Sequence, residues 1–237
     1  MSLRIPTYLP SATFESIQLV FSYYKSSKPD ATFVQVGACD GKTDDAVNRL
    51  LANSQFKSVL VEPIPMNYRI LENDYSGSEN VFLLNAAVGV EDGRSTIYSV
   101  RNTGRWKDSP VARQWASFNR SHLLKHGVKP GEIEEVDTEV VTIDSIRKRF
   151  GLPKIDILLV DAEGFDFEIV EMAVSSELKP DCIYFEYIHI KNKMRALAQI
   201  FKSAGYRFSY DKWNALAISQ DLIDQWESPE SSNNKPL

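Results

Sequence analysis

The sequence predicts an α/β fold, in which a mostly parallel sheet is covered by helices on both faces. Three observations predict it: short apolar segments alternate with segments of helical periodicity, the first apolar segment ends in a glycine turn, and several later ones end in acidic residues. Alternating strands and helices return the chain to the same end of a sheet, so that successive strands run parallel. A ligand crevice is therefore expected outside the carboxyl ends of these strands.

The expected elements follow one another from the N-terminus. Apolar residues at helical spacing predict a helix before residue 29 (Phe14, Ile17, Val20, Phe21 and Tyr24). Strands are expected at residues 33–37, 58–62, 81–85, 155–160 and 182–186, with helices at 43–53, from Pro65 onward, at 142–150, after 164 and at 191–204. Gly205 is a suitable left-handed end for the last of these helices. Short runs at 96–100 and 136–143 bracket a long irregular stretch, and residues 206–210 and 216–219 are expected to pair antiparallel.

The length of 237 residues fits one domain with extensions. We expect an N-terminal helical extension at residues 1–29 and a main domain at 30–220 that carries an insertion or lid at 101–131. Residues 221–237, rich in Ser, Asn and Pro toward their end, are expected to form a disordered tail.

Composition narrows the class of protein. A hydrophobic content of 43% and a charged content of 25% are typical of soluble globular chains. The net charge of −5, without a basic run, argues against nucleic acid as a partner. No apolar stretch reaches the roughly 18 to 20 residues that cross a bilayer, and the first ten residues lack a signal-peptide pattern. A cytoplasmic protein without a membrane span is therefore expected.

The glycine turn after the first strand is the most informative segment. Three residues separate Gly37 from Gly41, Lys42 and Thr43, whereas a phosphate-binding P-loop needs four. Cys39 stands where the dinucleotide fingerprint requires its second glycine. Asp40 would repel phosphate, so that the turn suits a cofactor without phosphate there, such as S-adenosylmethionine. An ordinary turn without a ligand remains the alternative.

Acidic residues stand at the exits of three of the five strands: Glu62, Asp161 and Glu186. Glu62 comes about 25 residues after the glycine turn, near the offset at which an acid binds ribose hydroxyls. Asp161 and Glu163 follow the most hydrophobic strand and suit a cofactor's amino group, a divalent ion or the proton of a hydroxyl nucleophile. The alternative for Glu62 is a helix-capping or solvated role, and Asp161 is also suited to cap the next helix. Asp166 and Glu168 are expected only to stabilise the dipole of that helix.

The histidines and cysteines suggest few functional roles. His189 follows the fifth strand and is a candidate general base, with a structural role as the alternative. His122 and His126 are four residues apart, but the sequence indicates no third ligand beside them, so that we expect no zinc site there. Cys39 and Cys182 are expected to be buried free thiols.

The segment 101–131 is aromatic and basic within an acidic chain (Arg105, Trp106, Trp115, Phe118, Arg120, His122, Lys125 and His126). Two interpretations are equally supported: a lid or sugar-binding loop, and a helical insertion packed on the core.

Taken together, these residues resemble the FkbM family of S-adenosylmethionine-dependent methyltransferases over residues 32–219. The motifs that carry the resemblance are residues 36–38, 61–63, 85–89, 142–145, 161–164 and 205–206. It implies a class I methyltransferase (Rossmann-like) fold, with a seven-stranded sheet whose last strand is antiparallel. It also implies methyl transfer to oxygen, often on sugars or polyketide-like natural products.

The resemblance also assigns roles to individual residues. Gly37, Ala38 and Glu62 would contact the cofactor, together with Asn85 and Ala86 at the third strand's exit, and Asp161 and Glu163 would line the reaction centre. Many members carry Asp two residues before the glycine, where this chain has Gln35. Two alternatives follow: Asp40 supplies the carboxylate for the cofactor's amino end, or Gln35 binds that end more weakly.

The mechanistic hypothesis is an in-line methyl transfer to a hydroxyl of a small-molecule or glycan acceptor. Asp161, Glu163 or His189 would take the hydroxyl proton, and a Mg²⁺ ion at Asp161 is a further expectation. Three alternatives remain: a non-catalytic glycan-binding protein on the same fold, a nicotinamide-dependent oxidoreductase, which the failed glycine fingerprint disfavours, and a methyltransferase whose acceptor is not a sugar.

Overall fold

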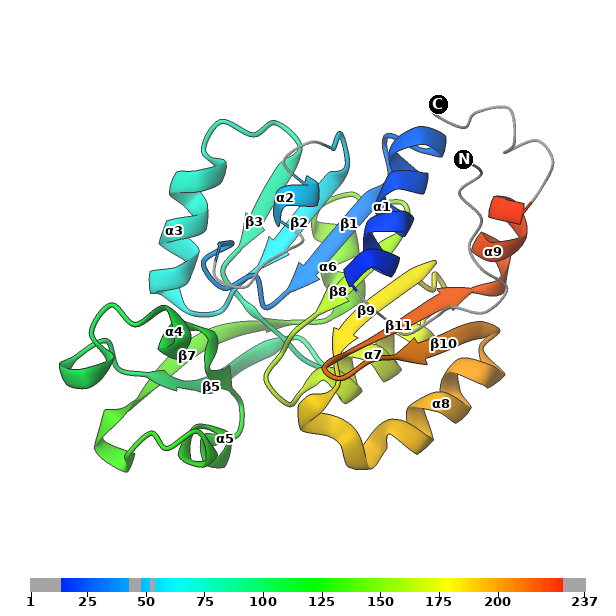
Figure 1. Cartoon of the computed structure of the whole chain (residues 1–237). Coiled ribbons are helices and arrows are strands. Elements are labelled where there is room, and N and C mark those ends of the chain that lie inside the picture. Colours follow the sequence, from blue (N-terminus) through cyan, green and yellow to red (C-terminus); the bar gives the residue numbers. More distant parts are fainter. Residues whose placement is uncertain (1–13, 43–47, 52–53, 228–237) are drawn as a thin grey trace.

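A computed structural model of the chain describes residues 14–42, 48–51 and 54–227, and its main element is a seven-stranded sheet (Figure 1). The strand order is β10-β11-β9-β8-β1-β2-β3. The strands are β1 (Thr32–Val36), β2 (Lys57–Val61), β3 (Val81–Leu84), β8 (Ile157–Val160), β9 (Cys182–Glu186), β10 (Tyr206–Tyr210) and β11 (Asn214–Ser219). β11 runs antiparallel to both of its neighbours, whereas the other neighbouring pairs are parallel. The predicted mostly parallel sheet with an antiparallel last strand is confirmed.

Helices cover both faces of this sheet, as predicted. One face packs against α1 (Phe14–Ser27), α2 (Asn48–Leu51), α3 (Pro65–Tyr75) and α9 (Gln220–Glu227). The other packs against α6 (Ile143–Arg149), α7 (Asp166–Ser175) and α8 (Met194–Ser203). Successive side chains of β1 point to opposite faces of the sheet. Phe33 is buried on the face covered by α1, α2, α3 and α9, and Val34 on the face covered by α6, α7 and α8.

A second, four-stranded sheet was not predicted. Its order is β4-β7-β5-β6, from β4 (Ala87–Val88), β7 (Ile133–Val141), β5 (Gly93–Val100) and β6 (Ala116–Ser117). Figure 1 shows it beyond the carboxyl ends of β1 and β2. The short helices α4 (Pro110–Gln114) and α5 (Arg120–Lys125) and the 3₁₀ turns η1 (Gly104–Trp106) and η2 (Pro130–Glu132) complete this part.

The segment 101–131 therefore belongs to a module with its own core. Val100, Ala112 and Leu123 are buried in that core, and Trp106 and Trp115 pack against it. These two tryptophans are thus partly buried structural residues, as the packed-insertion interpretation requires. Other side chains of the same segment face the pocket described below.

Several predicted boundaries need correction. Residues 221–227, expected in a disordered tail, belong to α9 (Gln220–Glu227), whose Leu222 and Ile223 are buried. The helix expected at 191–204 consists of η3 (Ile188–Lys193) followed by α8, and Gly205 follows it with φ +80°, as expected. Of the helix expected at 43–53, residues 48–51 are helical, and the rest lies outside the described residues, as do 1–13 and 228–237. Within the described ranges, no helix is both long and apolar enough to span a bilayer.

Candidate active site

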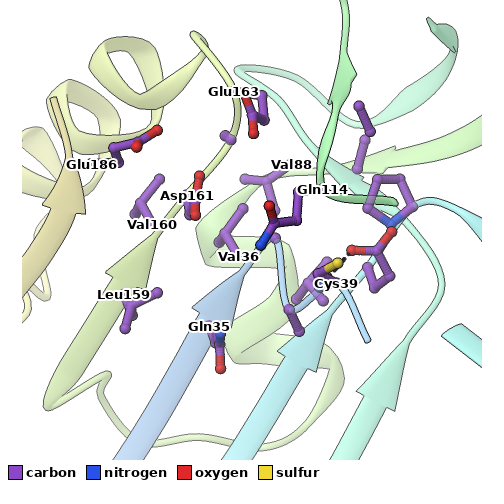
Figure 2. Close-up of a pocket in the computed structure, with 18 of the residues that line it drawn as sticks. Gln35, Val36, Cys39, Val88, Gln114, Leu159, Val160, Asp161, Glu163 and Glu186 are labelled. Carbon is purple, nitrogen blue, oxygen red and sulfur yellow. Dashed lines mark hydrogen bonds between the residues drawn. The ribbon is translucent and has the colours of Figure 1, made fainter. Parts of the chain in front are cut away.

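A pocket of about 290 Å³ lies at the carboxyl ends of β1, β2, β8 and β9, where the second sheet meets the main sheet. Six of the predicted site residues line it: Gly37, Ala38, Glu62, Ala86, Asp161 and Glu163. Figure 2 shows Asp161 and Glu163 on the loop that follows β8, with Gln114 of α4 opposite them. The pocket therefore occupies the crevice that the strand order predicts.

Gly37 brings the exits of β1 and β8 together. Its φ is +78°, and a Cβ atom built on it would lie 1.8 Å from the backbone oxygen of Asp161. The backbone N–H of Asp161 also donates to the oxygen of Val36 at 3.0 Å. The missing side chain thus accommodates a neighbouring loop of the protein.

Glu62 holds the turns after β1 and β2 in place. Its carboxylate accepts the backbone N–H of Cys39 at 2.9 Å, the backbone N–H of Ile64 at 2.8 Å and the amide of Asn67 at 3.3 Å. Burial raises the pKa of Glu62 to about 7, although these hydrogen bonds oppose the shift. A carboxylate with both oxygens engaged, at the wall of a pocket, is held in one orientation.

Asp40 and Asn85, two predicted cofactor ligands, do not line the pocket. Asp40 is buried, accepts the backbone N–H of Lys42 at 3.0 Å and lies 3.6 Å from Arg113 Nη1. Asn85 donates its amide to the backbone oxygens of Glu62 and Pro63. Both residues therefore support the wall of the pocket from behind.

Arg113 is the main pocket residue that sequence reasoning missed. It comes from α4, in the module of the second sheet, and its Nε atom is buried without a hydrogen-bond partner among the described residues. Asn67 Oδ1 is a second such atom, and the Asn67 amide donates to the backbone oxygen of Arg113. The sequence carries no specific signal for Arg113, because only the fold of the second module brings it to the strand exits.

The loop after β8 presents its acids in different ways. Asp166 folds back on this loop and accepts the backbone N–H groups of Ala162 and Gly164 at 2.9 and 3.0 Å. Burial raises the pKa of Asp166 to about 6. Asp166 is thus more than a helix-dipole residue. The N-cap residue of α7 is Phe165, whose side chain makes no capping hydrogen bond, so that Asp161 does not hold the N-cap position considered for it. Glu163 has φ +47°, a conformation that L-residues rarely adopt and that clusters at functional sites.

His189 does not line the pocket but lies directly behind its wall. His189 Nε2 is 3.4 Å from Glu163 Oε2 and 3.3 Å from Glu186 Oε2. Burial lowers the pKa of His189, and burial together with the charge of Glu163 raises the pKa of Glu186. Glu186 lines the pocket at the end of β9. His189 would therefore act on a ligand in the pocket indirectly, through these two carboxylates.

The expectation that His122 and His126 have no third ligand nearby is wrong. His122 Nε2 lies 2.7 Å from Glu163 Oε2 and 3.1 Å from His126 Nε2. Together with His189 these residues form what we call the histidine cluster (His122, His126, Glu163 and His189), whose potential ligand atoms all lie within 4.8 Å of one another. Asp161, the residue predicted to hold Mg²⁺, is not part of it.

The fold and the pocket define a class of protein. The arrangement is that of a class I methyltransferase: a seven-stranded sheet with an acidic pocket at the exits of its first, second and fourth strands, and a glycine turn without the spacing of a phosphate-binding loop. The sequence model of the Methyltransferase FkbM domain matches residues 35–208, most of the chain. The chain belongs to the FkbM methyltransferase family.

Solved structures support the fold. The FkbM methyltransferase of Methylobacillus flagellatus is similar over 80% of this chain and 44% of its own length, at 15% identity and a TM-score of 0.51. The methyltransferase domain of METTL16 is similar over 90% of this chain and 70% of that one, at 9% identity and a TM-score of 0.50. This chain thus spans less than half of the length of the FkbM structure. No curated protein matches the sequence.

Proposed function

We propose that this chain binds S-adenosylmethionine in the pocket and transfers its methyl group to a hydroxyl of a sugar, glycan or natural product. The observation that supports it most strongly is the set of carboxylates at the strand exits of a methyltransferase fold, Glu62, Asp161 and Glu163, all at the wall of one pocket. An acidic pocket suits a cofactor that carries a sulfonium cation and an amino group and no phosphate.

The pocket residues fit the separate parts of this cofactor. Glu62 is placed to accept a ribose hydroxyl through Oε2, for which the structure shows a single donor, Cys39 N–H. Ala38 and Ala86 offer small apolar wall positions for the adenine. Arg113, with a buried Nε that has no partner among the described residues, suits the carboxylate of the methionine end. Gln35 also lines the pocket, so that an amide would replace the acid that many family members carry there.

The acceptor side is expected at Asp161 and Glu163. S-adenosylmethionine supplies an electrophilic methyl group, so that the protein must orient the acceptor hydroxyl and take its proton. Asp161 and Glu163 line the pocket, and Asp161 lies next to Gly37. His189, in η3, does not line the pocket but lies 3.4 Å from Glu163 Oε2. These three residues are the candidates for that proton. A cytoplasmic location and a Mg²⁺ ion at Asp161 remain predictions.

The experiment that tests this function is a transfer screen. The full chain is incubated with methyl-labelled S-adenosylmethionine and panels of glycans, natural products and RNA, with and without chelator. Label is expected on a hydroxyl of a small molecule or glycan. Label on RNA alone would contradict the proposed acceptor class. Glycan binding without cofactor binding would support the non-catalytic alternative.

The affinity for S-adenosylmethionine is expected to decrease as the pH is lowered, because Glu62 becomes protonated. In the free protein its pKa is about 7, and the protonated carboxyl is a poorer acceptor for ribose hydroxyls. Since binding favours the ionised form, the affinity for S-adenosylmethionine should fall about tenfold between pH 8 and pH 6 and stay constant above pH 8. The charge of Asp40 raises this pKa further, whereas the hydrogen bond from the backbone N–H of Cys39 lowers it.

The Glu62→Gln variant checks this assignment by calorimetry across the same pH range. An amide can accept only one of the two backbone N–H groups that the carboxylate serves, so that the affinity should drop about 10-fold or more at pH 8. The slope with pH should also disappear. Glu79→Gln, an exposed glutamate, is the matched control and should keep the wild-type profile. An unchanged slope in Glu62→Gln would assign the titration to another group.

A further inference from the structure

We propose that the histidine cluster is a binding site for a divalent transition metal, with Zn²⁺ as the best match. The sequence contains three histidines, and all three are in this cluster. The four residues come from three segments: His122 and His126 lie in α5 and at its C-cap, His189 lies in η3, and Glu163 lies in the loop after β8. The inference does not depend on methyl transfer.

The distances fit a tetrahedral ion. Zinc binds imidazole nitrogens at about 2.0–2.1 Å and carboxylate oxygens at a similar distance, so that neighbouring ligand atoms are about 3.3 Å apart. The observed separations from Glu163 Oε2 are 2.7 Å to His122 Nε2 and 3.4 Å to His189 Nε2, and His126 Nε2 is 3.1 Å from His122 Nε2. All separations among the four potential ligand atoms are within 4.8 Å.

A bound cation explains the arrangement of these donor atoms better than hydrogen bonds among them do. His122 Nε2 faces both Glu163 Oε2 and His126 Nε2, and a proton on this nitrogen points at only one of them. A central cation accepts a lone pair from every one of these atoms. Three imidazoles and one carboxylate form a donor set that suits zinc, copper, iron or nickel rather than Mg²⁺, which prefers oxygen ligands.

The surrounding structure holds these ligands in place. Trp115 stacks on the ring of His126, with centroids 4.6 Å apart and an interplanar angle of 24°. Ser117 Oγ donates to the backbone oxygen of Glu163 at 2.9 Å, on the residue whose φ is +47°. The side chains of His122 and Glu163 are 10% and 12% exposed, whereas that of His189 is 25% exposed and provides an entry path. Supported ligands with a route from solvent are what a metal site requires.

A metal at this point would change the roles in the pocket. Glu163 lines the pocket, so that the ion would lie in its wall and connect α5, in the module of the second sheet, to the exit loop of β8. With their lone pairs on the metal, Glu163 and His189 would be ligands and not proton acceptors. Asp161 would then remain as the carboxylate that takes the acceptor's proton.

The test measures metal binding on the full chain without an affinity tag, since no other histidine then contributes. After treatment with chelator, Zn²⁺ titrated by calorimetry is expected to bind with a stoichiometry of one, and Co²⁺ is expected to give the visible absorption of a tetrahedral N/O site. His126→Ala, His189→Ala and Glu163→Gln should each weaken Zn²⁺ binding by about 100-fold or more. Lys125→Ala, exposed on α5, and Glu171→Gln, exposed on α7, are the matched controls and should bind as the wild type does.

Circular dichroism checks that each variant folds. If a variant does not fold, the Co²⁺ spectrum of the wild type tests the metal site instead. Absence of stoichiometric Zn²⁺ and Co²⁺ binding to the wild type would overturn the inference, as would binding that the three variants leave unchanged. Calorimetry with S-adenosylmethionine separates the two proposals: cofactor binding without metal binding overturns only the metal site, and the reverse overturns only the proposed function.

Discussion

The Asp161→Asn variant is expected to transfer methyl groups about 10²- to 10⁴-fold more slowly than the wild type, the usual contribution of a positioned proton acceptor. Asp161 lines the pocket directly beside Gly37, at the tip of β8 (Figure 2). Asparagine keeps the size of the side chain and removes its ability to take a proton. The measurement is the initial rate of label transfer to the acceptor that the screen identifies.

A split of the kinetic constants separates the two roles assigned to Asp161. If its carboxylate only binds the cofactor's amino group, Asp161→Asn should raise KM for S-adenosylmethionine and leave the rate at saturation unchanged. If it takes the acceptor's proton, the rate at saturation falls. Glu171→Gln, an exposed carboxylate on the following helix, is the control and should leave both constants unchanged. A wild-type rate at saturation in Asp161→Asn would contradict the assignment.

The Gly37→Ala variant is expected to lose about 3 kcal/mol or more of its free energy of unfolding. A left-handed conformation costs an L-residue roughly 1–2 kcal/mol, and forcing extra atoms into a packed site costs about 1–3 kcal/mol more. Here φ is +78° and the new Cβ would meet backbone, the Asp161 oxygen at 1.8 Å, which cannot rotate away. Urea unfolding of the variant and the wild type measures the difference.

Gly77 offers the matched control for this substitution. It is exposed, and a Cβ atom there meets nothing within 4 Å, so that Gly77→Ala should change the free energy of unfolding by less than about 1 kcal/mol. A similarly small change in Gly37→Ala would show that the loops after β1 and β8 do not need their close approach. Cofactor affinity measured on the same protein would then report whether the pocket tolerates the shift.

The main sheet and half of the pocket follow from local patterns. The strand predicted at residues 182–186 has the observed bounds of β9, and α3 begins at Pro65 as predicted. Apolar alternation and turn residues are short-range signals, so that the strand exits, and with them Glu62 and Asp161, are located correctly. Helix α9 was missed although Leu222, Ile223 and Trp226 have helical spacing, because the polar residues around them dominate the composition.

The other half depends on contacts between distant segments. In the second sheet Gly93 pairs with Val140, and Val100 pairs with Ile133. This antiparallel pairing joins strands on either side of a long insertion, and no local sequence pattern predicts it. That pairing carries Arg113 to the pocket and His122 to Glu163. His189 is remote in sequence from His122 and His126, so that spacing alone indicated only two ligands. The topology of the fold brings these residues to the site, and the periodicity of strands and helices does not determine that topology.

Calorimetry of S-adenosylmethionine binding to the full chain tests the central claim most directly. We expect one cofactor per chain with a micromolar dissociation constant, weakened about 10-fold or more by Glu62→Gln and unchanged by Glu79→Gln. No detectable binding, or binding that Glu62→Gln leaves at the wild-type affinity, would contradict a cofactor site at the exits of β1, β2 and β8.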